Sequence, residues 1–268
     1  MDDKNEHYFE VNRTHWNERT KVHVDSEFYD NASFKEGRNS INAIELPYVQ
    51  DITGKRVLHL QCHFGQDSIS LKRMGAASVT GVDFSEEAIQ EAKKLATETN
   101  TEVDFILGNV LEIDQFLKDE YDLIFCSYGV TGWLPQLDGW AKNIGRFLAA
   151  GGRFVYAEFH PAMWMFDDKV EKISFPYLHG DVISEEEEGT YTDGGENLRY
   201  TMFGWNYGIS EVITPLLNNG LQLKTFKEFD HSPYECWPNM VKTEYGLQIK
   251  GMEGLLPMVY LIEMEKAV

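Results

Sequence analysis

Two features of the sequence could together hold a nucleoside. The first is the turn at residues 57–68, where an apolar run gives way to a helical pattern and Gly65 lets the backbone approach a ligand closely. The second is Asp83, which ends the next apolar run about 20 residues beyond the turn. A carboxylate in that place can accept hydrogen bonds from both hydroxyl groups of a ribose. The alternative interpretation of Asp83 is a residue that caps a turn or a helix.

Further candidate residues follow the later apolar runs. Asn109 comes directly after one of them, and its amide oxygen can accept a hydrogen bond from an amino group, although an ordinary Asn turn is the alternative. Residues 121–129 form another buried run that ends in polar and aromatic side chains. Glu158 and His160 follow the next run, and either could take a proton from a bound molecule. A structural His that the backbone satisfies is at least as good an interpretation of His160.

The elements that must position these residues alternate between strand and helix. Strands are expected at residues 57–60, 78–82, 103–107, 121–127, 153–158, 222–229 and 257–265, and helices at 67–74, 85–99, 140–148 and 210–218. This alternation predicts an α/β fold with a mostly parallel sheet. The last two strands should pair as an antiparallel hairpin, because no helical pattern separates them. Ligands bind such sheets beyond the carboxyl ends of the strands, which is where the candidate residues lie.

The motifs resemble those of class I S-adenosylmethionine-dependent methyltransferases, whose first motif reads roughly apolar-Asp-apolar-Gly-Cys-Gly-x-Gly. This chain keeps that pattern at Val57, Leu58, Leu60, Cys62 and Gly65. It has His59 in place of the acid, and Gln61 and His63 in place of the first two glycines. The spelling LHLQCHFGQDS is similar to that of a largely uncharacterised bacterial subgroup. Residues 79–85 (VTGVDFS) and 148–153 (LAAGGR) also resemble family motifs, in the family's order.

The resemblance implies a Rossmann-like, seven-stranded, mostly parallel sheet with an antiparallel last strand, and S-adenosylmethionine as the cofactor. It places Asp83 at the ribose, Asn109 at the adenine amino group, and residues 121–129 where the methionine part of the cofactor meets the substrate. The cofactor-binding residues predicted in this way are Gln61, His63, Gly65, Gln66, Asp83, Phe84, Ser85, Asn109, Val110, Ser127 and Tyr128. The implied reaction is in-line transfer of the sulfonium methyl group, which releases S-adenosylhomocysteine.

Two segments are expected to cover this site. Residues 1–50, which are rich in aromatic and His side chains, predict an N-terminal cap of one or two short helices on a methyltransferase domain at residues 51–268. Residues 160–207 predict an inserted β-hairpin or meander that acts as a lid, with the acidic run 185–188 as its solvated tip. The predicted substrate contacts are Tyr29, Trp133, Trp205 and Tyr207, with His23 and residues 231–234 as further candidates. The alternative for these aromatic residues is packing between the insert and the sheet.

Composition restricts the partners. The 268 residues carry a net charge of -20 and no basic cluster, which disfavours nucleic acid and anionic membranes and favours a small-molecule methyl acceptor. Three cysteines without a CxxC pair and the lack of an apolar leader predict a cytoplasmic protein, and no metal site is expected. Two alternatives stay open. One is a module that binds S-adenosylmethionine without turnover, which the first-motif substitutions motivate; the other is a nicotinamide-dependent oxidoreductase, against which the missing glycines argue.

Overall fold

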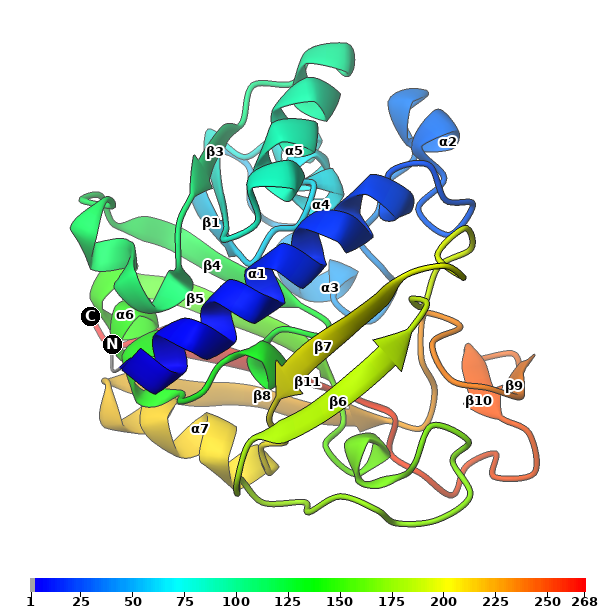
Figure 1. Ribbon diagram of the computed structural model, residues 1–268. Coiled ribbons are helices and arrows are strands. Elements are labelled where there is room, and N and C mark those ends of the chain that lie inside the picture. Colours follow the sequence, from blue (N-terminus) through cyan, green and yellow to red (C-terminus); the bar gives the residue numbers. More distant parts are fainter. Residues whose placement is uncertain (1–2) are drawn as a thin grey trace.

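The computed structural model describes residues 3–268, and its centre is a seven-stranded sheet with the order β3-β2-β1-β4-β5-β11-β8 (Figure 1). The strands are β1 Arg56–Leu60, β2 Ser78–Asp83, β3 Asp104–Leu107, β4 Tyr121–Ser127, β5 Leu148–Phe159, β8 Leu221–Phe229 and β11 Val259–Lys266. β11 runs antiparallel to both β5 and β8, whereas β1 to β5 pair in parallel. The predicted α/β fold with an antiparallel last strand is therefore confirmed, and β8 and β11 pair as expected.

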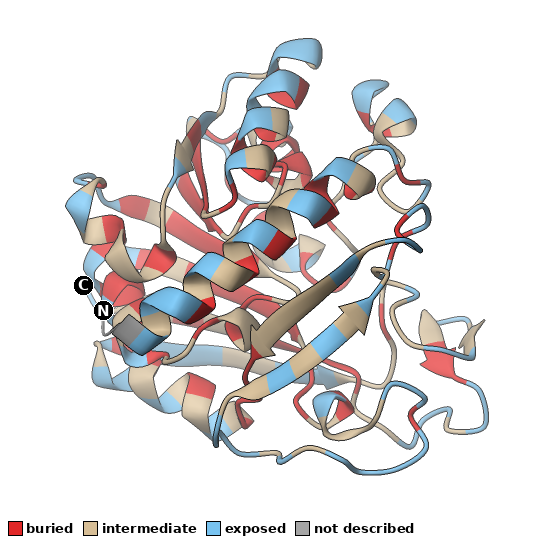
Figure 2. Cartoon of the chain, in the orientation of Figure 1, coloured by how far each residue is buried: buried red, intermediate tan, exposed pale blue. Residues whose placement is uncertain are grey.

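Helices cover both faces of the sheet. They are α4 Gln66–Arg73, α5 Glu86–Glu98, α6 Asp138–Phe147 and α7 Ile209–Asn218. Successive residues of β1 point to opposite faces. Leu58 and Leu60 pack in the same cluster as Trp140 of α6 and Leu216 of α7, whereas Val57 packs with residues that include Leu71 of α4. Because both faces are buried (Figure 2), the central strands are continuous apolar runs, and the carboxyl ends of the strands are left to form the site.

The N-terminal segment differs from the prediction of one or two short helices. α1 (Asp3–His23) is one helix of 21 residues, and the short helices α2 (Asn31–Lys35) and α3 (Leu46–Val49) follow it. Its buried stripe has helical spacing but is mostly polar, since it includes Asn12, His15, Arg19 and His23. A search for apolar periodicity therefore does not detect the full length of this helix.

α1 connects the inserted segment to the main domain. Asn12 makes two hydrogen bonds to the backbone of Phe203, one from its Nδ2 to the carbonyl oxygen (2.8 Å) and one from the Phe203 N–H to its Oδ1 (3.0 Å). Further along the helix, Asn17 accepts a hydrogen bond from Ser85 Oγ (2.7 Å) and donates one to Glu86 (2.9 Å) at the start of α5. Figure 1 shows α1 between α5 and β7, so the helix holds the β6–β7 segment next to the helices of the central sheet.

The insert contains the expected antiparallel hairpin, formed by β6 (Ile183–Glu188) and β7 (Arg199–Gly204). The acidic run does not form its tip, which lies at residues 189–198. It forms β6 itself, with Glu185 and Glu187 half-buried and Glu186 and Glu188 exposed, so the prediction of a solvated tip was wrong. A second small hairpin, β9 (Met240–Lys242) with β10 (Leu247–Ile249), follows β8 and precedes β11 in the sequence, forms a separate sheet and is not predicted. Within residues 3–268, no helix is long and apolar enough to cross a membrane.

Candidate active site

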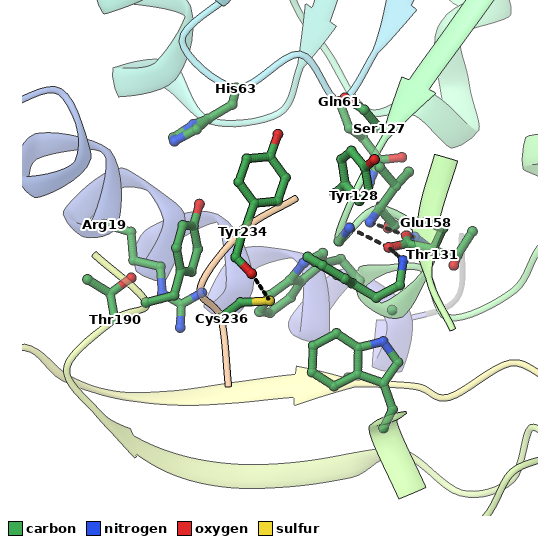
Figure 3. A pocket seen from close by; sticks show the side chains of 18 of the residues that line it. Arg19, Gln61, His63, Ser127, Tyr128, Thr131, Glu158, Thr190, Tyr234 and Cys236 are labelled. Atoms are coloured by element: carbon green, nitrogen blue, oxygen red, sulfur yellow. Dashed lines mark hydrogen bonds between the residues drawn. The ribbon is translucent and has the colours of Figure 1, made fainter. Parts of the chain in front are cut away.

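A cavity of about 630 Å³ lies beyond the carboxyl ends of the central strands (Figure 3). Its walls come from the loop after β1, the ends of β2, β4 and β5, α1, the β6–β7 hairpin and the segment before β9. Residues that are far apart in the sequence therefore meet there. Eight of the predicted cofactor residues line it: Gln61, His63, Gly65, Gln66, Asp83, Phe84, Ser127 and Tyr128. The predicted substrate contacts Tyr29, Trp133, Trp205 and Tyr207 line it as well.

The loop after β1 keeps the backbone of a glycine-rich turn without the glycines. Gln61 and His63 have φ angles of 54° and 50°, in the left-handed region, and Gly65 has a φ of 82°. Gln61 and His63 are the two positions at which the related family has glycine. A residue with a side chain is less stable in this conformation by about 1–2 kcal/mol. This cost is present at two positions of the same loop, which indicates that the two side chains have a function.

Each of these side chains joins the loop to another segment. Gln61 Nε2 donates a hydrogen bond to the carbonyl oxygen of Val130 (2.9 Å), in the loop after β4, while its buried Oε1 has no hydrogen-bond partner in the described part of the chain. His63 Nε2 lies 3.0 Å from Nδ1 of His23, whose Nε2 lies 2.8 Å from Thr190 Oγ1. Burial lowers the pKa of His63 to about 3 and also lowers that of His23, so both imidazoles are neutral near pH 7.

Asp83 ends β2 with its carboxylate turned toward this loop. Its Oδ2 accepts a hydrogen bond from the His63 N–H (2.8 Å), and its Oδ1 accepts one from the Ser85 N–H (2.9 Å). Burial raises its pKa to about 6, and the backbone N–H groups act in the opposite direction. An ionised carboxylate offers about four acceptor positions, so capacity for two ribose hydroxyl groups remains.

Two charged residues that the sequence reasoning missed line the same end of the cavity. Asp67, in the first turn of α4, accepts hydrogen bonds from Ser40 Oγ (2.6 Å) and Ser127 Oγ (3.0 Å). Arg38 donates to Gln66 Oε1 (3.3 Å), and its buried Nε has no partner among residues 3–268. The position of Asp67 inside the first motif was a usable signal. No sequence signal marked Arg38, because the segment after α2 reaches the cavity only in the folded chain.

Three predicted cofactor residues do not line the cavity. Ser85 caps α5 by accepting a hydrogen bond from the Ala88 N–H (3.1 Å). Asn109 caps the short 3₁₀ helix η1 (Val110–Gln115) by accepting one from the Leu111 N–H (2.9 Å), and Val110 is buried in the core. The geometry of Asn109 fits the alternative interpretation of an Asn turn. Its contact with an adenine amino group stays a prediction that the shape of the cavity does not support.

The predicted proton acceptors are held by other groups. Glu158 lines the cavity, but its two carboxylate oxygens accept hydrogen bonds from the N–H groups of Gly129 (2.6 Å) and Val130 (2.7 Å) and from Tyr156 Oη (3.1 Å). It therefore shapes the loop after β4. His160 does not line the cavity: Nε2 lies 3.0 Å from Glu228, and Nδ1 accepts from the Ala162 N–H (3.1 Å). The geometry favours a structural role for both residues over the predicted catalytic one.

One more buried acid lies behind the cavity wall. Glu45 is fully buried next to α3 and accepts hydrogen bonds from Tyr128 Oη (2.8 Å) and from the backbone N–H of Asn42 (2.8 Å). Burial raises its pKa to about 7.

Tyr128 has a φ of 41° and is the third residue with a side chain in the left-handed region at this site. Backbone strain at three places around one cavity is typical of a functional site.

The centre of the chain is similar in sequence to known proteins. Residues 57–152 match a family described as "Methyltransferase domain". The centre of the chain is therefore similar to a methyltransferase domain. Its sequence is similar to a ubiquinone biosynthesis O-methyltransferase of Klebsiella pneumoniae, with 32% identity over 121 residues that cover 44% of this chain and 49% of that protein. The ribosomal protein L11 methyltransferase of Symbiobacterium thermophilum is 27% identical over 124 residues, which cover 44% of this chain and 40% of that protein. The matched region is thus less than half the length of these two relatives.

Solved structures extend the similarity over most of the chain. A putative S-adenosylmethionine-dependent methyltransferase from Listeria monocytogenes superposes with a TM-score of 0.57 at 22% identity, covering 84% of this chain and 98% of that one. An S-adenosylmethionine-dependent methyltransferase from Mesorhizobium loti gives a TM-score of 0.56 at 16% identity and covers 87% and 100% of the two chains. At such low identity the similarity establishes the fold, which agrees with the predicted class I methyltransferase architecture.

Proposed function

We propose that this protein transfers the methyl group of S-adenosylmethionine to a small-molecule acceptor. The observation that carries the proposal is the convergence of Gln61, Asp67 and Asp83 on one cavity at the carboxyl ends of β1, β2 and β4, within a methyltransferase domain. This is the edge at which parallel sheets bind ligands. Two buried polar atoms at that end of the cavity, Gln61 Oε1 and Arg38 Nε, have no hydrogen-bond partner among residues 3–268 and are available to a ligand with hydrogen-bonding groups.

The residues present fit this cofactor group by group. Asp83 would accept hydrogen bonds from the ribose hydroxyl groups. Asp67 would attract the α-ammonium group, and Arg38 Nε, which lacks a partner among residues 3–268, would donate to the α-carboxylate. Gln61 Oε1 is a second acceptor for the ammonium group. When bound, the cofactor supplies an electrophilic methyl group on a sulfonium whose leaving thioether is neutral.

The protein's part in the reaction is to align the acceptor and exclude water. Alignment of two reactants can contribute roughly 7–11 kcal/mol to catalysis. α1 and the β6–β7 hairpin lie over the cavity and would act as a lid, which limits the acceptor to a small molecule. The side chains of Glu158 and His160 are occupied by structural hydrogen bonds, so we assign neither the role of an obligatory base. An acceptor that loses its proton to water after transfer needs none.

The test is a thermal-shift titration with S-adenosylmethionine, S-adenosylhomocysteine and NAD. A ligand at 100 times its Kd stabilises by about 2.7 kcal/mol, which raises the Tm of a chain of this size by several degrees. We expect a shift with both adenosyl compounds and none with NAD, and loss of the shift in Asp83→Ala. A shift with NAD alone would favour the oxidoreductase, and an unchanged shift in Asp83→Ala would contradict the ribose assignment.

A further inference from the structure

The wall of the cavity below the lid carries charges of opposite sign that do not pair with each other. Arg19 of α1 and Glu187 of β6 both line the cavity. The ion pairs of the described residues include neither of them. Burial raises the pKa of Glu187 while the nearby positive charge of Arg19 lowers it, so the two groups are close enough to interact but are not in contact. A ligand can therefore bind between them.

Arg19 is a buried cation that forms no ion pair with any residue that the structure describes. Its side chain is only 8% exposed, and its guanidinium carbon lies 5.0–5.9 Å from the ring centroids of Tyr200, Trp16, Trp133 and Tyr191. Tyr200 Oη accepts hydrogen bonds from its Nε (3.1 Å) and from one terminal nitrogen. A guanidinium has five N–H donors, so others remain available. Burial of a charge without a counterion is costly, and the planar fork of Arg matches a carboxylate in two parallel hydrogen bonds. Arg19 thus points to an anionic group on the ligand.

The β6 strand carries four consecutive acids, and of these only Glu186 and Glu188 have side-chain partners among the residues that the structure describes. Glu186 accepts a hydrogen bond from Thr201 Oγ1 (2.6 Å), and Glu188 pairs with Arg199. The half-buried Glu185 and Glu187 line the cavity, and their carboxylates have neither a hydrogen bond nor an ion pair with any residue from 3 to 268 that the structure records. Burial raises the pKa of Glu185, and repulsion by Glu187 and Asp168 raises it further. A cation near these carboxylates would remove that repulsion.

We propose that the methyl acceptor is an amphoteric small molecule of the amino-acid type, with a carboxylate bound by Arg19 and an ammonium group bound by Glu185 and Glu187. A simple anion would meet the repulsion of the glutamates, and a simple cation would meet that of Arg19. A molecule that carries both groups satisfies both sides of the wall. This inference rests on the proposed function, because it names the acceptor of the same methyl transfer.

The charge class of the product tests the inference. The protein is incubated with S-adenosylmethionine labelled in the methyl group and a small-molecule metabolite extract. The labelled product is separated from the unreacted cofactor, which is itself amphoteric, and is applied to a cation exchanger at acid pH and to an anion exchanger at alkaline pH. We expect both resins to retain the label. A labelled product that passes through either resin would overturn the inference while leaving the proposed methyl transfer intact. No labelled product at all, above a control without extract, would count against the proposed function itself.

Variants of the wall separate recognition from folding and from cofactor binding. With the labelled fraction as acceptor, Arg19→Gln and the double variant Glu185→Gln/Glu187→Gln should each raise KM by about tenfold or more, since losing one partner of a buried charge pair is costly. Glu186→Gln is the matched control on the outer face of the same strand and should leave KM unchanged. The thermal shift with S-adenosylhomocysteine should be the same in all of these proteins. A KM change in Glu186→Gln as large as in the double variant would overturn the assignment.

Discussion

The backbone of the loop after β1 gives a prediction whose sign can be worked out from the structure. Gln61 has a φ of 54°, so any residue with a Cβ is strained there by about 1–2 kcal/mol, whereas glycine is not. Gln61→Gly and Gln61→Ala both lose the hydrogen bond to Val130, which cancels in the comparison. Glycine also loses about 0.4–1 kcal/mol through the greater freedom of its unfolded chain. The middle values of these two ranges make the glycine variant more stable than the alanine variant by about 0.8 kcal/mol.

Urea unfolding of the two variants measures this difference, provided that the free energy of unfolding falls with urea concentration at the same slope in both. Gln66, the first residue of α4, is the control because it has ordinary helical geometry and its side chain is also hydrogen-bonded, donating to Tyr29 O and Asn31 Oδ1 and accepting from Arg38. There the order should reverse, since alanine is favoured over glycine in a helix by about 0.5–1 kcal/mol. If Gln61→Ala proves as stable as Gln61→Gly, the loop does not hold the strained conformation and the argument for its side chains fails.

The other predictions concern buried groups around the cavity. Glu158→Gln should lower the free energy of unfolding by about 1–3 kcal/mol, because the amide's nitrogen cannot accept the loop N–H groups; a large loss of activity at unchanged stability would instead support a catalytic base. His160→Gln should leave the affinity for S-adenosylhomocysteine unchanged in calorimetry, as it lies outside the cavity lining. The pKa of Glu45 is raised by burial to about 7 from 4.5, so the folded state holds this proton more tightly. The free energy of unfolding of the wild type should therefore fall by about 3 kcal/mol relative to that of Glu45→Gln as pH rises from about 4.5 to 7, measured by unfolding at several pH values; equal pH profiles would contradict the raised pKa of this buried acid.

The sequence predicts the sheet well because each strand is marked by a short apolar run that recurs along the chain. The strands of a parallel sheet buried on both faces are continuous apolar runs, and the residues at their carboxyl ends meet whatever the details of the loops. Asp83 could be placed in the site for that reason. Helix α1 was harder to predict, because the stripe that it buries is polar and packs on aromatic rings and backbone groups of the insert.

The remaining site residues depend on contacts between distant segments. Arg19 and Arg38 reach the cavity from the N-terminal segment, and Glu187 reaches it from the insert, so no spacing within one motif relates them. The structural role of Glu158 could not be predicted either, because a carboxylate at a strand end looks the same in sequence whether it faces a substrate or backbone and hydroxyl donors. The acidic run was predicted as a tip because its alternation between a buried and an exposed face appears only when β6 pairs with β7.

The most direct test of the central claim is the release of S-adenosylhomocysteine from S-adenosylmethionine, quantified by mass spectrometry in the presence of a small-molecule extract. We expect release above the control without extract, in proportion to a methylated small molecule, and its loss in Asp83→Ala. A wild-type protein that binds S-adenosylhomocysteine in the thermal titration but releases none with any extract would contradict methyl transfer and identify a binding module.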